Sequence, residues 1–575
     1  MTRLFQLWRA SVTLALFACA PVASTPAARG QSPAPAGAVS LEVDLDQRVG
    51  EMYPMWAYFG YDEPNYTYSW EGEKLLTELA ELSPVPVHIR AHNMLTTDEG
   101  PRSAFKWGST NAYTEDANGN PVYDWEVMDR IVDTWVQRGM KPLMEMGFMP
   151  KALSTNPEPY RHNWEPGDPY GQIYTGWSYP PKDYEKWGEL IYQWVRHSVE
   201  RYGEAEVATW WWQLWNEPDA TYWQGTTEEY LKLYDYTAAA VKRALPTARV
   251  GGPNVTGASN NRQSTFLRAF LDHVRGGTNY VTGERGSPID FIGFHAKGSP
   301  QFIDGRVRTN MAPELRHFDR AFDIISSYPE LRELPVIIGE ADPEGCAACS
   351  VASGSRQNAY RNGTMYSSYT AASFARMYEI ADRYDVDLEG ATSWSFTFEN
   401  VPWFDGVREL ATNGVGKPVL NVFRMFGMMG GDRVAVRGNA MDAWQIIEEG
   451  VRAEQADVSA LASREEDAAA VMVWNYHDDD LPAPDAPVRL TIRNVPAERA
   501  LVHHYRIDDD HSNSYAVWLE MGAPQQVSRE QYAELEKAGK LELLDAPEWV
   551  EVRDGAVELD FPLPRQGVSL VQLEW

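Results

Sequence analysis

The chain has 575 residues, with 51 basic and 82 acidic side chains and a net charge of −31. An acidic surface of this size repels the phosphates of nucleic acid and of anionic lipid, so neither is expected as a partner. Aromatic residues make up 12% of the chain. This content is typical either of large apolar cores or of a site lined by flat rings, as sugar-binding clefts are.

Residues 1–39 are predicted to be a signal peptide followed by an Ala/Pro-rich linker. Arg3 and Arg9 precede the apolar run "SVTLALFACA", and small residues follow it. This run is too short for a membrane span, and no later run approaches the roughly 20 apolar residues that a span needs. We therefore expect an exported protein, periplasmic or extracellular, without membrane insertion. Cys19 leaves a lipoprotein open, although Phe17 is unusual in a lipobox.

Residues 40–425 are predicted to form a (β/α)₈ TIM barrel of the α/β class. Eight short runs rich in β-forming residues alternate with segments of helical period such as "YEKWGELIYQWVRHSVERYG". The β-type runs are 52–60, 85–92, 141–148, 208–216, 248–255, 290–298, 335–343 and 390–398. Strands that alternate with helices in this way predict a parallel sheet closed into a barrel.

Residues 426–575 are predicted to form a C-terminal β-sandwich domain. Runs such as "PVRLTIRNV" and "VSLVQLEW" read as strands with turns between them. One helical insert, "SREQYAELEKAGKLELL", interrupts them. A strand at 40–48 precedes the barrel and is expected to join the sandwich.

Cys346 and Cys349, in "EGCAACS", are the only cysteines besides Cys19. A lone C-x-x-C lacks the second pair that a structural zinc site needs. A disulfide that pins a loop suits an exported protein. A redox role is the weaker alternative, because no thioredoxin-like context surrounds the pair.

Titratable residues end several of the predicted strands, where TIM barrels place their catalytic groups. The run 208–216 ends in Asn216, with Glu217 next, and the run 335–343 contains Glu340. Glycoside hydrolysis needs two carboxyl groups that flank one glycosidic bond. Neighbouring carboxylates also separate each other's pKa values, so that one stays protonated and the other ionised. Two glutamates at an aromatic-rich barrel mouth therefore predict a glycoside hydrolase.

The motifs "WNEPD" and "GEADP" resemble the acid/base and nucleophile motifs of glycoside hydrolase family 39, which contains β-xylosidases and α-L-iduronidase. The segments "DDDHSNSYAVWLEMGAP" and "LPRQGVSL" resemble the β-sandwich of the same family, so the resemblance covers roughly residues 40–575. It implies that Glu217 is the acid/base, that Glu340 is the nucleophile of a retaining mechanism, and that Asn216 hydrogen-bonds the sugar 2-hydroxyl. Members of the family use no metal or organic cofactor, so none is expected.

Seven further residues at or beyond the strand ends are expected to line the substrate site. They are Arg90, His92, His295, Lys297, Trp394, Glu399 and Arg408. Arg90 and His92 match family positions at the sugar subsite. Trp394, Phe396 and Trp403 can all be core residues, but at least one of them is expected to form a sugar platform, and Trp394 is the one assigned to the substrate site.

Several of these residues also have a purely structural interpretation. Glu217 alone could be the first-turn acid of the following helix, favoured by the helix dipole. Glu340 could be a buried partner of Arg90. His295 could be a satisfied interior histidine, and Asp219 is expected to be a cap or loop acid.

Lys297 and Arg408 bear on which terminal sugar is released. Lys297 in "FHAKG" and Arg408 in "FDGVRELAT" resemble the iduronidase branch, and such a cationic pair suits a uronate carboxylate. Lys297 can instead pair with a loop acid such as Asp342, and "HSNSYAVWLEMG" is similar to bacterial β-xylosidases. We therefore expect first an exo-acting β-xylosidase on oligo- or polysaccharide, with an α-L-iduronidase-like uronide hydrolase as the alternative. An endo-acting hydrolase and a non-catalytic carbohydrate-binding barrel stay open, and the oligomeric state is not predicted.

Overall fold

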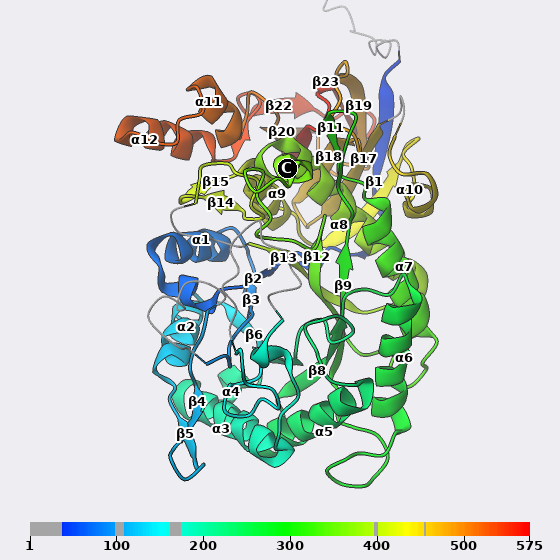
Figure 1. Cartoon of the computed structure of the whole chain (residues 1–575). Helices are drawn as coiled ribbons and strands as arrows, with labels where there is room; N and C mark the ends of the chain where they lie inside the picture. The colour runs from blue at the N-terminus through cyan, green and yellow to red at the C-terminus, as the bar shows by residue number, and fades with distance from the viewer. Residues whose placement is uncertain (1–36, 98–107, 161–173, 396–400, 453–455) are drawn as a thin grey trace, which may run out of the picture. The chain divides into compact units, whose positions relative to one another are not determined.

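The computed structural model describes residues 37–97, 108–160, 174–395, 401–452 and 456–575, and residues 38–575 form one compact unit (Figure 1). The predicted signal peptide and most of the linker lie outside the described residues. The domain boundary at residue 425 stays a prediction, because one unit spans both sides of it. Within the described part of the chain, no helix is long and apolar enough to cross a bilayer.

Eight parallel strands close into a barrel in the order β12–β13–β2–β3–β6–β7–β8–β9, which confirms the predicted TIM barrel. The strands are β2 (Tyr58–Tyr61), β3 (His88–Ala91), β6 (Lys141–Met146), β7 (Trp211–Leu214), β8 (Arg249–Val255), β9 (Phe291–Lys297), β12 (Val336–Asp342) and β13 (Leu388–Trp394). Each predicted run overlaps one of them. Strand β7 ends before the predicted residue 216, because Trp215 (φ 61°) and Glu217 (φ 48°) have left-handed backbone that cannot continue a strand.

Helices surround the barrel (Figure 1). They are α1 (Trp70–Glu81), α2 (Glu126–Val136), α3 (Tyr184–Tyr202), α4 (Glu204–Val207), α5 (Thr227–Ala244), α6 (Asn261–Gly276), α7 (Ala312–Ser326), α8 (Thr364–Tyr384) and α9 (Pro418–Gly427). Capping boxes start two of them, with Thr226 and Glu229 at α5 and Asn260 and Gln263 at α6. These reciprocal bonds satisfy backbone N–H groups that a helix start otherwise leaves without partners.

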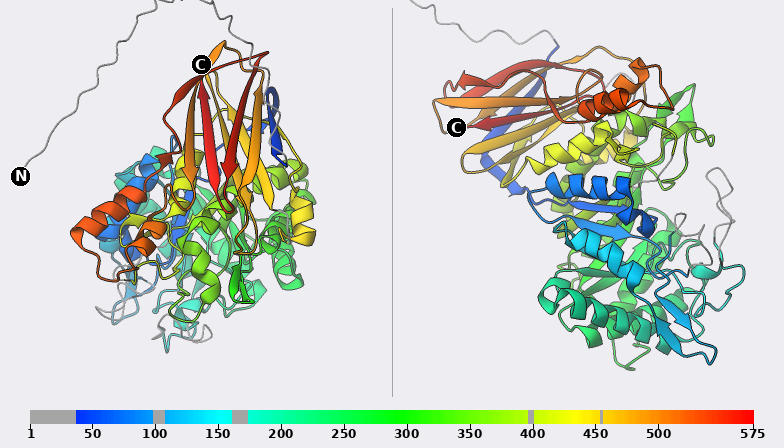
Figure 2. Two further views of the ribbon diagram at one scale, coloured as in Figure 1. Left: turned by 90° about the horizontal axis from the view of Figure 1, so that it is seen from above. Right: turned by 90° about the vertical axis from the view of Figure 1, so that its left-hand side faces the viewer.

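The remaining strands form mainly one ten-stranded sheet, in the order β21–β20–β24–β18–β17–β16–β1–β19–β23 with β22 beside β20 (Figure 2). They are β1 (Val39–Glu51), β16 (Asp432–Arg437), β17 (Asp457–Arg464), β18 (Ala468–Tyr476), β19 (Ala486–Arg493), β20 (Arg499–Ile507), β21 (Glu542–Leu543), β22 (Glu548–Glu551), β23 (Ala556–Leu563) and β24 (Val568–Glu574). Strand β1 pairs antiparallel with β16 and parallel with β19. Apolar residues from both ends of the strand order share one core, so the sheet closes over itself as the predicted β-sandwich.

Strand β18 shows how the sandwich joins the barrel. Val471 and Val473 lie in the sandwich core, whereas Met472 and Trp474, on the opposite face of the strand, lie in the large core shared with the barrel helices. Helix α8 packs against β18 as well as α7 and α9, and is therefore buried on nearly all sides.

The shorter strands and helices are β4 (Tyr113–Glu115), β5 (Pro121–Tyr123), β10 (Gln301–Ile303), β11 (Arg306–Arg308), β14 (Ala411–Thr412), β15 (Val415–Gly416), α10 (Ala443–Glu449), α11 (Ser514–Glu520) and α12 (Arg529–Ala538). Short 3₁₀ helices are η1 (Pro64–Tyr68), η3 (Gly176–Ser178) and η4 (Arg356–Asn362). Helix α12 lies in the predicted helical insert, whereas α11 was not predicted. Trp403 is buried in a small cluster with Phe404, Trp518 and Leu535. It is therefore a core residue where α11 and α12 meet the barrel loops.

Candidate active site

The two predicted catalytic glutamates lie at the C-terminal end of the barrel, on different strands. Glu217 follows β7 by three residues, and Glu340 is the fifth residue of β12, a strand buried along its whole length. A Cβ at Gly339 would lie only 2.8 Å from Nε2 of His295. The glycine therefore leaves room for the His295 ring beside Glu340.

His295 lies between the two carboxylates. Its Nδ1 is 2.9 Å from Oε1 of Glu217 and 3.7 Å from Oε1 of Glu340. One oxygen of each carboxylate and one nitrogen of the ring all lie within 4.8 Å of one another. Retaining glycosidases separate their two carboxyls by about 5–5.5 Å, and inverting ones by about 6.5–9.5 Å. One oxygen of Glu217 thus lies no more than 4.8 Å from one oxygen of Glu340, which fits the retaining spacing better than the inverting one.

Cations surround Glu340. The Lys297 ammonium contacts Oε2, Arg90 lies 3.3 Å from Oε1, and Arg408 lies 3.9 Å from Oε2. Burial alone would raise the pKa of Glu340, but the Lys297 ammonium is the largest cause that opposes burial, and that pKa lies well below its ordinary value. Glu340 is therefore an ionised carboxylate at neutral pH, as a nucleophile must be.

Glu217 has the opposite electrostatics. Its side chain is 17% exposed, against 6% for Glu340. Burial and the negative charge of Glu340 raise the pKa of Glu217 to about 7. A carboxyl with this pKa holds a proton at neutral pH and can give it up, as a general acid and base must.

The loop after β7 is fixed by hydrogen bonds. The Glu217 N–H donates to the Asn254 carbonyl at 2.9 Å. The Asp219 carboxylate accepts from the N–H and the hydroxyl of Thr256, both at 2.7 Å. Asp219 is thus a loop acid that ties the Glu217 turn to the end of β8.

Arg90 forms the floor of the site and is fully buried. Its guanidinium donates to Oδ1 of Asn216 at 2.8 Å and to Oε1 of Gln213 at 2.9 Å, and pairs with Glu145 at 2.8 Å. Because Oδ1 of Asn216 accepts from Arg90, the amide NH₂ of Asn216 is left as the donor for a sugar hydroxyl.

His92 and Trp394 lie beside Arg90. Nη1 of Arg90 is 2.7 Å from Nε2 of His92. Nδ1 of His92 faces Asp62 at 2.8 Å. Burial lowers the pKa of His92, but the Glu145 charge and the hydrogen bond to Asp62 outweigh burial and raise that pKa to about 9. The Trp394 ring packs 4.8 Å from the His92 ring and is only 1% exposed. Its role as a sugar platform stays a prediction.

Lys297 and Arg408 both contact protein carboxylates. Lys297 lies 3.3 Å from Asp342, the loop acid considered from the sequence, in addition to its contact with Glu340. Arg408 is 1% exposed and lies 3.1 Å from Asp342 and 3.5 Å from Glu344. Neither cation is therefore an unpaired binding group.

Some groups of the site were not foreseen and one cannot be placed. Glu145, in β6, is fully buried against Arg90 and His92, and burial raises its pKa. Its signal was a lone acid inside the apolar run "KPLMEMGF". Asp62 and Gln213 were also not predicted.

Glu399 lies outside the described residues, as does Phe396. Cys346 and Cys349, in the loop after β12, are bonded to each other.

Glu217, His295 and Glu340 have atoms close enough together to hold a metal ion. The Lys297 ammonium and the Arg90 guanidinium already direct positive charge at Glu340. Another cation at this point would be repelled. We interpret the three residues as a hydrogen-bonded acid pair bridged by a histidine.

Comparison with known proteins supports the same chemistry. The family model described as "Glycosyl hydrolases family 39" matches residues 43–548. The chain belongs to glycoside hydrolase family 39. It is therefore a glycoside hydrolase and not a non-catalytic carbohydrate-binding barrel.

Relatives of this family 39 enzyme include β-xylosidases and α-L-iduronidases. A β-xylosidase of Caldicellulosiruptor saccharolyticus is 28% identical over 459 residues, which cover 78% of this chain and 82% of the relative. An α-L-iduronidase of Mus musculus is 22% identical over 574 residues, which cover 92% of this chain and 77% of the relative. The crystal structure of a monomeric β-xylosidase from Caulobacter crescentus CB15 has a TM-score of 0.71 at 21% identity, covering 93% of this chain and 99% of that one. This structure supports the fold.

Proposed function

We propose that this family 39 enzyme is an exo-acting, retaining β-xylosidase that releases terminal neutral sugars from oligo- or polysaccharide. The observation that supports it most is the pair of carboxylates at retaining distance with opposite pKa shifts. A retaining mechanism needs one carboxyl that is protonated and one that is ionised in the same site.

In the proposed mechanism, Glu340 attacks the anomeric carbon while Glu217 protonates the departing glycosidic oxygen. The glycosyl–Glu340 ester that forms cancels the negative charge beside Glu217, so the pKa of Glu217 falls and its carboxylate becomes a base. Glu217 then takes a proton from water as that water attacks the anomeric carbon. Asn216, oriented by Arg90, donates to the sugar 2-hydroxyl.

Lys297 and Arg408 already form ion pairs with carboxylates of the protein, and this favours a neutral sugar as substrate. A uronate carboxylate would have to compete with Glu340 and Asp342 for Lys297, and with Asp342 and Glu344 for Arg408. Like charges at this range in a buried site repel strongly. The α-L-iduronidase relative keeps a uronide hydrolase as the second candidate.

Labelling of the nucleophile tests the mechanism. Glu340 should displace the anomeric fluoride of a 2-fluoro-xylosyl fluoride, which leaves as fluoride ion. The sugar ester that stays on the peptide containing Glu340 is read by mass spectrometry. A label on any other residue would contradict the assignment. A panel of 4-nitrophenyl β-xyloside, α-L-iduronide, β-glucuronide and α-L-arabinoside then tests the sugar, and we expect the xyloside to have the highest kcat/KM.

We also propose that the mature enzyme is exported and works outside the cytoplasm. The arginines and apolar run of residues 1–20 support this proposal, and so does the disulfide, because such bonds persist in oxidising compartments. N-terminal sequencing of the secreted enzyme from its natural host would identify the mature start. A start at Met1 would contradict the proposal.

A further inference from the structure

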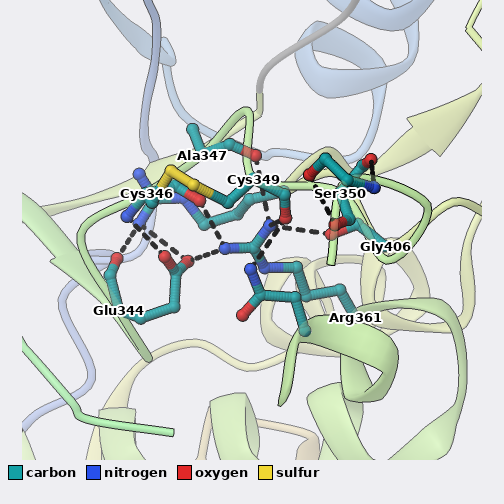
Figure 3. Close-up of a disulfide and its surroundings, with 10 residues drawn as sticks. Glu344, Cys346, Ala347, Cys349, Ser350, Arg361 and Gly406 are labelled. Atoms are coloured by element: carbon teal, nitrogen blue, oxygen red, sulfur yellow. Dashed lines mark hydrogen bonds and ion pairs between the residues drawn. A yellow bond between two sulfur atoms is a disulfide. The ribbon is translucent and has the colours of Figure 1, made fainter. Parts of the chain in front are cut away.

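The start of the loop after β12 is held by one disulfide and one ion pair (Figure 3). Cys346 and Cys349 are joined by a disulfide. The Glu344 carboxylate, two residues before Cys346, accepts from the Cys346 N–H at 2.5 Å and pairs with Arg361. Figure 3 shows the disulfide and the Arg361 guanidinium on two sides of the same short backbone turn.

Arg361 is fully buried and lies just before α8. Its guanidinium binds backbone carbonyl groups of this turn. Its guanidinium donates to the carbonyls of Cys346 at 2.6 Å and Ala347 at 3.1 Å. It also donates to the carbonyl of Gly406 at 2.7 Å, which belongs to the loop after β13. One side chain thus ties together two loops that are far apart in the sequence.

Arg408, two residues beyond Gly406, extends from this junction toward the catalytic pair. Its N–H donates to the Ala347 carbonyl at 2.9 Å, so its backbone is held by the disulfide turn. Its guanidinium contacts the carbonyl and the carboxylate of Glu344, and lies 3.1 Å from Asp342. It lies 3.9 Å from Glu340.

We infer that the Cys346–Cys349 disulfide and Arg361 form a clamp that positions Arg408 beside the nucleophile. The clamp fixes both the backbone of Arg408 and the Glu344 carboxylate to which its guanidinium binds. Arg408 in turn fixes Asp342, which shares Lys297 with Glu340. Arg361 does not touch the reacting atoms, so it is a positioning residue for the reaction, and the inference rests on the proposed role of Glu340.

Electrostatics makes such a clamp effective. Charges and titratable groups face Glu340 from every side, namely Arg90 and His92 at β3, Glu145 on β6, Glu217 after β7, His295 and Lys297 on β9, Asp342 on β12, and Arg408. Little solvent screens charges at this depth, so a small displacement of one cation changes the free energy of its neighbours. A loosened Arg408 would let Asp342 draw Lys297 away from Glu340.

Two variants test the clamp: the double substitution Cys346→Ser with Cys349→Ser, and Arg361→Lys. Each is assayed on an aryl glycoside that the wild type hydrolyses, with active sites counted by covalent labelling. We expect kcat per labelled site to fall about tenfold at neutral pH, because Glu340 and its cations are then no longer held in one arrangement. The acidic limb of kcat/KM should move up by about one pH unit, because Lys297 then stabilises the Glu340 carboxylate less. KM should stay within about twofold, since Arg361 binds no substrate.

The wild type offers a test without substitution. Dithiothreitol passes two electrons and two protons to the disulfide and becomes its own cyclic disulfide, which leaves two thiols in the turn. Alkylation of both thiols then holds the turn open, and the same kinetic change is expected in enzyme that keeps its circular dichroism spectrum.

Arg376→Lys is the matched control. Arg376 is a buried arginine of α8 that pairs with Asp457 of the sandwich, at 3.0 Å. Its substitution should lower Tm and leave the acidic limb in place. If the clamp variants and the reduced enzyme also show a lower Tm with an unchanged acidic limb, the clamp is purely structural and the inference is overturned. A label that is not on Glu340 would instead overturn the proposed function, so the two failures can be told apart.

Discussion

The two proposed catalytic carboxylates, Glu217 and Glu340, are the same residue type in one site, yet their surroundings differ in charge and in backbone. Glu340 lies inside a buried strand and contacts Lys297, with Arg90 at 3.3 Å. Glu217 lies on a left-handed turn beyond the end of its strand, and its hydrogen-bond partner His295 is neutral, since burial holds the pKa of His295 well below its ordinary value. Charge and backbone support, more than residue type, therefore distinguish the proposed nucleophile from the proposed acid.

Loss of the proposed nucleophile should lower kcat more than any other substitution considered. Glu340→Ala is expected to lower kcat by about ten-thousandfold or more, because the covalent step is removed. Added azide should restore turnover by attacking from the vacated side, and the glycosyl azide product should have inverted configuration. Proton NMR of that product is the measurement. A product of retained configuration would contradict the assignment of Glu340.

Loss of the acid should have a smaller effect that depends on the substrate. Glu217→Ala is expected to lower kcat/KM by about 10²–10⁴-fold on a glycoside with a poor leaving group. On a dinitrophenyl glycoside, whose leaving group needs no proton, the first step should be nearly unaffected. Here azide should give a product of retained configuration. Equal losses on both substrates would show that Glu217 is not the acid.

The sequence could predict both carboxylates because each lies near the end of a recognisable β-type run and within a motif. The eight β-type runs alternate with helical segments, and this pattern alone indicates the barrel. It could not predict Glu145, because its partnership with Arg90 exists only once β3 and β6 lie side by side. It also left open whether Lys297 contacts Asp342, since that depends on how a long flexible side chain settles among several acids. Helix α11 had a signal in Asn513, whose side chain caps it, but seven residues are too few for a clear period.

The pH dependence should separate the two carboxylates. In the wild type, kcat/KM should fall above about pH 7 as Glu217 loses its proton. On the acid side it should fall only below the ordinary range of a glutamate, because the lowered pKa of Glu340 keeps that group ionised. Lys297→Met removes the ammonium beside Glu340, so the pKa of Glu340 rises and the acidic limb should move up by about one pH unit or more.

In Lys297→Met, the shift of the basic limb is the reference against which the shift of the acidic limb is judged. Lys297 also lowers the pKa of Glu217, but it ranks there behind burial and the charge of Glu340. The basic limb should therefore move up less than the acidic limb, and the pH range of activity should become narrower. An acidic limb that stays in place would mean that Lys297 does not keep the nucleophile ionised.

The smallest effect on activity should come from weakening the backbone turn that carries Glu217, a support that Glu340 does not need because it lies within a strand. Asp219→Ala removes the acceptor for both Thr256 donors and so releases the turn that carries Glu217. We expect the free energy of unfolding to fall by about 1–2 kcal/mol, and kcat to fall a few-fold on poor leaving groups only. Asp183→Ala is the control, because Asp183 caps α3 through two backbone donors and its loss costs a similar amount, about 1 kcal/mol, away from the site. If both variants lose stability and neither changes its leaving-group dependence, the turn does not position Glu217. A kinetic loss in Asp219→Ala alone would show that Glu217, unlike Glu340 within its strand, depends on the Asp219 contacts of its loop for its position.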